Sequence, residues 1–145
     1  MELRHRMTFA GCVVFASVML TGRAAWAVDP CSLLTTDQAA AALGVPDVNA
    51  GAGANRCIWT PKKYKQGAGQ LTLLLEGAND GAKMTGQGNA VSGIGDEAIQ
   101  TGVGNGAVLH VRKGNTWFVV NVHGVPPDQA TQVEQTVAKE VLAKL

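Results

Sequence analysis

Residues 107–122 read AVLHVRKGNTWFVVNV. The central Gly114-Asn115 fits the two-residue type II′ turn of a β-hairpin, because glycine readily adopts the positive φ that the first turn position requires. One face of the resulting hairpin is wholly apolar, so both strands select the same register and the pattern predicts a hairpin from Ala107 to Val122. Counting outward from the turn gives the pairs Lys113–Thr116, Arg112–Trp117, Val111–Phe118, His110–Val119, Leu109–Val120 and Ala107–Val122.

The opposite face of this hairpin carries a mixed set of side chains, namely Arg112, Trp117, His110, Val119 and Asn121. Two interpretations of this face stay open. A cross-strand cation–π contact between Arg112 and Trp117 would add about 0.5–1 kcal/mol of local stability at an exposed site. Alternatively, an exposed Trp117 beside His110 and Val119 forms a recognition patch. Trp117, Arg112 and His110 are therefore the candidate binding residues, provided that no helix packs over them.

A short helix is predicted near the start of the folded region. Asp29-Pro30-Cys31 is expected to be extended, because proline disfavours helical conformation at the residue before it. Thr35 and Gln38 then have the spacing of a capping box, and Gly44 follows as a helix stop. The helix between them is alanine-rich and short, so docking rather than intrinsic propensity must hold it in place.

Short apolar stretches predict three strands before the hairpin, at 56–60, 71–76 and 98–101. Cys57 and Trp59 share one face of the first strand, because side chains alternate along a strand. The glycine-rich segments 45–55 and 77–95 are predicted to be loops. The longer one, 77–95, is a second candidate binding edge, since loops of that length are often functional.

A C-terminal helix is predicted after Pro126-Pro127, because proline is tolerated at the first helical position. Its apolar stripe recurs at steps of three and four residues and contains Ala130, Val133, Val137, Ala138, Val141, Leu142 and Leu145. Its polar face is expected to hold Glu134, Gln135, Lys139 and Glu140, which are not cationic enough to favour a membrane surface. The elements together predict an α+β fold with a largely antiparallel sheet of about 4–5 strands, flanked by the short N-terminal and the longer C-terminal amphipathic helix.

Residues 1–27 have the order of a secretory signal peptide. A positive start at Arg4-His5-Arg6 precedes an apolar stretch over 7–20, and Ala25-Trp26-Ala27 is an A-x-A cleavage pattern. The apolar stretch is shorter than the roughly 20 residues needed to span a bilayer. Cleavage after Ala27 would leave 28–145 as a single domain. Lipidation of Cys12 is disfavoured, because Cys12 lies near the start of the apolar stretch rather than after it.

Removal of the predicted signal peptide leaves two cysteines, Cys31 and Cys57. A disulfide between them would close a loop of about 27 residues and stabilise the domain by roughly 3–4 kcal/mol in the chain-entropy model. A redox or zinc role is disfavoured, because the chain has no CxxC and two isolated cysteines lack the spacing of a zinc site. A structural disulfide indicates the periplasm or secretion, where it can persist.

Charge excludes one class of partner. Removing 1–27 takes away three arginines and one glutamate, so the formal net charge changes from +1 to −1. A nearly neutral domain lacks the electrostatic footprint of a nucleic-acid-binding protein. The local basic cluster Lys62-Lys63-Tyr64-Lys65 is interpreted as a solvated loop rather than as an anion or lipid-headgroup site. We expect a monomer without stable membrane insertion.

Catalytic and cofactor motifs are weak. His110 and His123 would lie about 13 Å apart along the hairpin, too far to share a metal ion. Asp96 and Glu97 are adjacent and would point to opposite faces of a strand, so they would not converge on one bond. The glycines of 102–106 lack the Gly-Lys-Ser/Thr of a phosphate loop. No catalytic residue, metal or cofactor is therefore predicted.

Several short motifs give the chain a family resemblance. Asp29-Pro30-Cys31-Ser32-Leu33-Leu34-Thr35, Cys57-Ile58-Trp59 and Gly93-Ile94-Gly95-Asp96-Glu97-Ala98 resemble segments of domain-of-unknown-function family 3558. That resemblance covers nearly all of 28–145 and implies an exported α+β domain with a disulfide, without an established activity. Many members are lipoproteins, whereas this chain lacks a properly placed lipobox.

The sequence therefore favours a non-enzymatic binding or accessory domain of the periplasm or cell exterior, with an envelope protein or small ligand as its partner. The alternative is a small exported hydrolase that uses His110 or His123 with Asp96 or Glu97.

Overall fold

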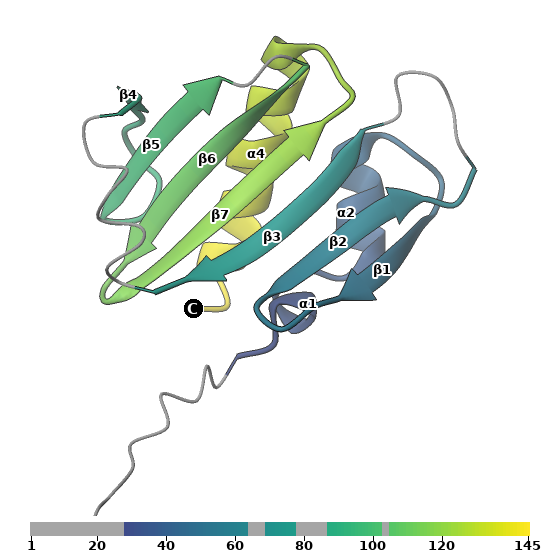
Figure 1. Ribbon diagram of the computed structural model, residues 1–145, viewed down its shortest axis with the longest axis horizontal. Helices are drawn as coiled ribbons and strands as arrows, with labels where there is room; N and C mark the ends of the chain where they lie inside the picture. The colour runs from purple at the N-terminus through teal and green to yellow at the C-terminus, as the bar shows by residue number, and fades with distance from the viewer. Residues whose placement is uncertain (1–27, 64–68, 78–86, 103–104) are drawn as a thin grey trace, which may run out of the picture.

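The computed structural model describes residues 28–63, 69–77, 87–102 and 105–145. Their strands form one antiparallel sheet in the order β1-β2-β3-β7-β6-β5-β4 (Figure 1). The strands are β1 (Val48–Ala52), β2 (Arg56–Pro61), β3 (Gln70–Glu76), β4 (Asn89–Ala90), β5 (Glu97–Gly102), β6 (Gly106–Lys113) and β7 (Thr116–His123).

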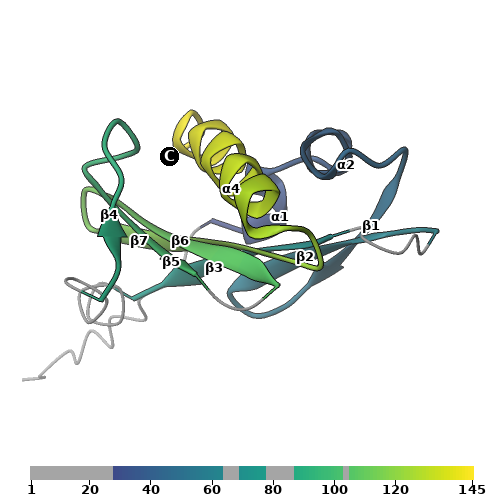
Figure 2. The ribbon, with the colours of Figure 1, turned by 90° about the horizontal axis from the view of Figure 1, so that it is seen from above.

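The helices among the described residues are α1 (Pro30–Leu33), α2 (Thr36–Leu43) and α4 (Pro127–Leu142). Both α2 and α4 lie on the same side of the sheet (Figure 2), with α4 over β6 and β7 and α2 over β1 and β2. The hydrophobic core fills the space between this helical layer and the sheet. The fold is thus α+β, as predicted, with a C-terminal helix packed on an antiparallel sheet.

The central hairpin β6–β7 has the predicted register at every pair, from Lys113–Thr116 to Ala107–Val122. Gly114 has a φ of 58°, and within the described ranges only glycines have positive φ, which fits a type II′ turn. The six apolar side chains expected on one face are all buried. This hairpin supplies the two strands beneath α4.

The described sheet has seven strands, so the expectation of 4–5 was too low. The prediction of a loop over 45–55 was wrong, because β1 lies inside it and pairs with β2 from Val48–Pro61 to Ala52–Cys57. Its sequence, VNAGA, buries only Val48 and has no apolar alternation. Backbone pairing at the sheet edge, rather than side-chain burial, therefore defines this strand. The two-residue β4 likewise interrupts the predicted loop 77–95 by pairing with β5.

The N-terminal helical region differs from expectation in one respect. Pro30 begins a helical turn, α1, instead of continuing an extended segment. The Asp29 side chain accepts a hydrogen bond from the Cys31 backbone N–H at 3.0 Å, which caps this turn. Proline at the first helical position needs no N–H partner, so the Asp-Pro pair starts a helix here. The capping box of Thr35 and Gln38 on α2 is confirmed in both directions.

Helix α4 buries the predicted apolar stripe from Ala130 to Val141. Two expectations about this helix were wrong. Glu134, assigned to the polar face, is fully buried beneath the helix, while Leu145 lies beyond the helix end and is exposed. The side chain of Glu134 reaches the sheet from this face and accepts hydrogen bonds from Gln100 and from the Val122 N–H.

Cys31 and Cys57 form the predicted disulfide, with a Cα–Cα distance of 5.1 Å. The bridge joins α1 to the start of β2. Cys57 and Trp59 both point into the core, as their alternation predicted. The disulfide therefore connects the helical layer to the same strand that ends at Pro61.

Gly106, the first residue of β6, lies very close to the backbone of β7. A Cβ atom at this position would overlap the carbonyl oxygen of Val122 and lie 3.1 Å from the Cα of His123. Gly106→Ala is therefore expected to lower the free energy of unfolding by about 1–3 kcal/mol, because backbone must move to admit the methyl group. Urea denaturation measures this change.

Gly102→Ala is the matched control, since a Cβ atom there meets nothing within 4 Å. It is expected to change stability by less than about 0.5 kcal/mol. Equal effects of the two substitutions would contradict the close approach of β6 and β7 at Gly106.

Candidate functional site

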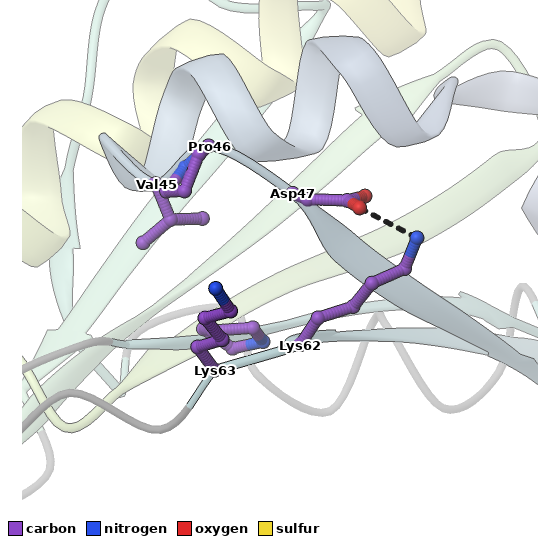
Figure 3. A pocket seen from close by; sticks show the side chains of 6 residues that line it. Val45, Pro46, Asp47, Lys62 and Lys63 are labelled. Atoms are coloured by element: carbon purple, nitrogen blue, oxygen red, sulfur yellow. Dashed lines mark ion pairs between the residues drawn. The ribbon is translucent and has the colours of Figure 1, made fainter.

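A pocket lies at one end of the sheet, where two segments of the chain meet (Figure 3). Its first wall is 45–47, which leads from α2 into β1. Gly44 ends α2 in the left-handed conformation at φ 66°, and the Val45 N–H donates to the Ala40 carbonyl at 3.0 Å. This Schellman-type ending directs the chain from the helix toward the sheet.

The second wall is 61–63, at the end of β2. Val48 pairs with Pro61, and the Lys62 N–H donates to the Asp47 carbonyl at 3.2 Å. Pro61 continues the alternation of Cys57 and Trp59, so it faces the helical layer. Backbone pairing thus fixes the two walls relative to each other.

The pocket has a volume of about 500 Å³. This size lies within the range of about 300–1,000 Å³ that is usual for small-molecule sites. Its lining is mainly apolar and comes from Val45, Pro46 and Pro61 together with the stems of the lysines. Two prolines on facing walls reduce the backbone freedom that a bound ligand would otherwise have to freeze.

Among the described residues, Asp47, Lys62 and Lys63 are the charged groups that border the pocket. Lys62 Nζ forms an ion pair with Asp47 Oδ2 at 2.5 Å (Figure 3). The hydrogen bond from Lys62 lowers the pKa of Asp47, so this carboxylate stays ionised. Within the described ranges, Lys63 has neither an ion pair nor a hydrogen-bond partner. Its side chain rises from the end of β2 toward Val45 (Figure 3).

The predicted binding face of the central hairpin is arranged differently from expectation. Trp117 is only 3% exposed and His110 only 7% exposed, although α2 and α4 pack on the other face. The expectation of an exposed tryptophan was therefore wrong. His110 Nδ1 lies 3.8 Å from Glu76 Oε2, and both atoms lack a hydrogen-bond partner. His110 is on β6 and Glu76 is on β3, so the two side chains approach each other across the intervening strand β7.

Arg112, the third predicted binding residue, interacts with two acidic side chains. Its Nε atom donates to Glu97 Oε2 at 3.2 Å, and Nη1 lies 3.9 Å from Asp96 Oδ2. Asp96 also accepts a hydrogen bond from the Gly114 N–H at 2.7 Å. The two carboxylates converge on one guanidinium, so the expectation that they diverge was wrong. Asp96 precedes β5, and the alternation of side chains along a strand therefore does not apply to it. The predicted cation–π contact with Trp117 is not among the contacts of Arg112.

The alternative hydrolase required a histidine beside Asp96 or Glu97. The acidic side chain within ion-pair distance of His110 is Glu76, while Asp96 and Glu97 are paired with Arg112. His123 lies at the exposed end of β7, opposite Gln70 and Gly106. The geometry therefore brings neither histidine into a pair with the expected carboxylates.

A buried carboxyl group, which the sequence interpretation placed on the surface, lies beneath α4. Glu134 Oε2 accepts from Gln100 Nε2 at 2.7 Å, and Oε1 accepts from the Val122 N–H at 3.2 Å. Burial raises the pKa of Glu134 to about 7, although the two hydrogen bonds favour its ionised form. The group is enclosed between helix and sheet, so its effect is on stability rather than on a ligand.

Some predicted features lie outside the described residues. These are the signal peptide 1–27 with Cys12, Tyr64 and Lys65 of the basic cluster, 78–86 of the second candidate binding edge, and 103–104. In the remaining chain, no group of three or more His, Cys, Asp or Glu side chains could hold a metal ion. None of the described helices is long and apolar enough to cross a membrane.

The sequence contained only an indirect signal for the pocket. Val45-Pro46-Asp47 and Pro61-Lys62-Lys63 are each ordinary turn sequences. Their proximity depends on the pairing of β1 with β2, and β1 was not predicted. The basic cluster at 62–65 alone indicates no more than a solvated loop.

Comparisons of the chain with protein-family models, curated proteins and solved structures found no match in any of the three. The resemblance to domain-of-unknown-function family 3558 stays a prediction.

Proposed function

We propose that this protein is an exported, non-enzymatic binding domain of the periplasm or cell exterior, and that its ligand occupies the pocket between 45–47 and 61–63. The pocket carries this proposal. It combines a ligand-sized volume, an apolar lining and a small number of charged groups, which is the usual composition of a small-molecule site.

Two observations support the proposed location. The Cys31–Cys57 disulfide suits an oxidising compartment. The signal-peptide pattern of 1–27 supplies a route to that compartment. Membership of domain-of-unknown-function family 3558 is part of the same proposal, because that family consists of exported domains.

A ligand screen tests the proposal. The full-length chain is expressed for export with ¹⁵N labelling, and the protein is recovered from the periplasm. Octanoate, octyltrimethylammonium, octyl glucoside and inorganic phosphate are then titrated separately. At least one amphiphile is expected to shift the amide signals of Asp47, Lys62 and Lys63 in a saturable manner, because these amides border the pocket.

Val45→Trp should abolish this saturable shift by filling the pocket. Gln132→Trp, an exposed position on α4, is the control and should leave the shift unchanged. If no probe gives saturable shifts at the pocket, or if Val45→Trp binds as well as the unmodified protein, the proposed site is wrong.

A further inference from the structure

We propose that the pocket is selective for an anionic amphiphile, a molecule with a short apolar body and one carboxylate or phosphate head. The apolar body would lie against Val45, Pro46 and Pro61, and the head would pair with Lys63. This inference rests on the proposed function and specifies the chemical class of the ligand.

The charges that border the pocket determine which charge the head group of the ligand carries. Asp47 neutralises Lys62 through their ion pair, so the three charged groups among the described lining residues sum to one positive charge, at Lys63. The ammonium group of Lys63 has no partner within the described ranges. An anionic head group would acquire a charge-assisted hydrogen bond there, whereas a cationic head would be repelled.

The lining determines the rest of the ligand. The apolar side chains on both walls contribute binding free energy only when the ligand buries apolar surface against them. A fully polar anion has no such surface and would bind weakly. Pro46 and Pro61 hold these surfaces in place before binding. An apolar body therefore contributes affinity, while Lys63 selects the head group.

A free amphiphile fits better than a bilayer surface. Electrostatic attachment to anionic membranes typically requires clusters of 4–8 basic residues. The cluster at 62–65 contains three lysines, and the chain after Ala27 has a formal net charge of −1. A concave pocket of about 500 Å³ also suits one molecule rather than an extended interface.

The test compares probes that share an octyl chain and differ in the head group: octanoate, octyl phosphate, octyltrimethylammonium and octyl glucoside. Binding to the exported full-length product is measured by ¹⁵N titration below the micelle concentration. The two anions are expected to bind at least about fivefold more tightly than the cation. Their affinity should fall as ionic strength rises, since the lysine is solvent-accessible.

Two substitutions at the pocket should act in opposite directions. Lys63→Gln is expected to weaken octanoate binding by about fivefold or more, because it removes the unpaired charge. Asp47→Asn should strengthen binding severalfold, because it releases Lys62 from its partner. Lys113→Gln, on the distant turn of the central hairpin, is the control and should have no effect.

The outcomes separate this inference from the proposed function. If octyl glucoside or octyltrimethylammonium binds at the pocket as well as octanoate does, the site exists but the anionic class is wrong. If Lys63→Gln and Lys113→Gln behave alike, Lys63 does not select the head group. Stronger binding to phosphatidylglycerol vesicles than to monomeric octanoate would replace the free amphiphile with a membrane surface. Absence of saturable shifts with every probe would overturn the pocket itself.

Discussion

Replacing both Cys31 and Cys57 with alanine is expected to lower the free energy of unfolding by about 3–4 kcal/mol. The bridge spans 26 residues of sequence and ties α1 to β2, so its loss releases a long loop in the unfolded chain. Stabilities of typical domains are about 5–15 kcal/mol, and a change of this size is a large part of that total. Urea denaturation of the oxidised protein and of the double variant measures the difference.

Reduction provides the matched control for this experiment. The unmodified protein treated with dithiothreitol should become about as unstable as the double variant, while the double variant should not respond to dithiothreitol. A difference below about 1 kcal/mol between the oxidised protein and the variant would contradict a stabilising role for the bridge.

The second large effect concerns the buried carboxyl group beneath α4. Glu134→Gln is expected to raise the free energy of unfolding at pH 8 by up to about 3 kcal/mol, because it removes the cost of a buried negative charge. Glutamine keeps an oxygen that can accept from the Val122 N–H. Gln100 Nε2 donates to the other carboxylate oxygen of Glu134, so the Gln100 amide must turn over. Its Oε1 atom, which has no hydrogen-bond partner, then accepts from the new glutamine.

The sign of the pH dependence follows from the raised pKa of Glu134. Between pH 4.5 and about 7 the folded protein holds a proton on this carboxyl group that the unfolded chain has lost. Stability linked to this group is therefore fully present below pH 4.5, decreases as pH rises through about 7, and is constant above that. Glu134→Gln should remove this decrease and match the unmodified protein at pH 4.

Denaturation at several pH values tests the linkage. Glu140→Gln, an exposed position on the same helix, is the control and should keep the decrease of the unmodified protein. Glu134→Ala separates charge from packing. It leaves the Val122 N–H without its acceptor and Gln100 Nε2 with only the Val108 carbonyl, so it should destabilise the protein. If Glu134→Gln is less stable than the unmodified protein at pH 8, the carboxylate must be a net stabilising acceptor.

Elements specified by local chemistry were predicted accurately. The central hairpin followed from Gly114-Asn115 and from two strands whose apolar faces coincide in one register. The N-terminal end of α2 followed from Thr35 and Gln38, which satisfy each other's backbone groups. In both cases the residues that determine the geometry are close together in the sequence.

Elements that depend on distant partners were missed. The VNAGA strand has no apolar pattern and exists because its backbone pairs with β2. Glu134 appeared polar and exposed, yet Gln100 and the Val122 N–H on the sheet provide the hydrogen bonds that allow its burial. The pocket has the same origin, because its two walls meet only when β1 pairs with β2.

The stabilising disulfide and the proposed binding pocket involve opposite ends of one strand. Cys57 links the start of β2 to α1, and Pro61 at the end of the same strand forms part of a wall of the pocket. The disulfide therefore anchors the strand that leads to Lys62 and Lys63. The central hairpin, with Trp117 and His110 buried, is part of the scaffold.

The central claim is that a ligand with an apolar body enters the pocket between 45–47 and 61–63. Intermolecular nuclear Overhauser effects between octanoate and the exported full-length product test it most directly. The account predicts effects from the terminal methyl group of octanoate to the Val45 methyl groups and to the ring protons of Pro46 and Pro61. Saturable octanoate binding whose effects fall elsewhere on the protein, or the absence of any saturable binding, would contradict it.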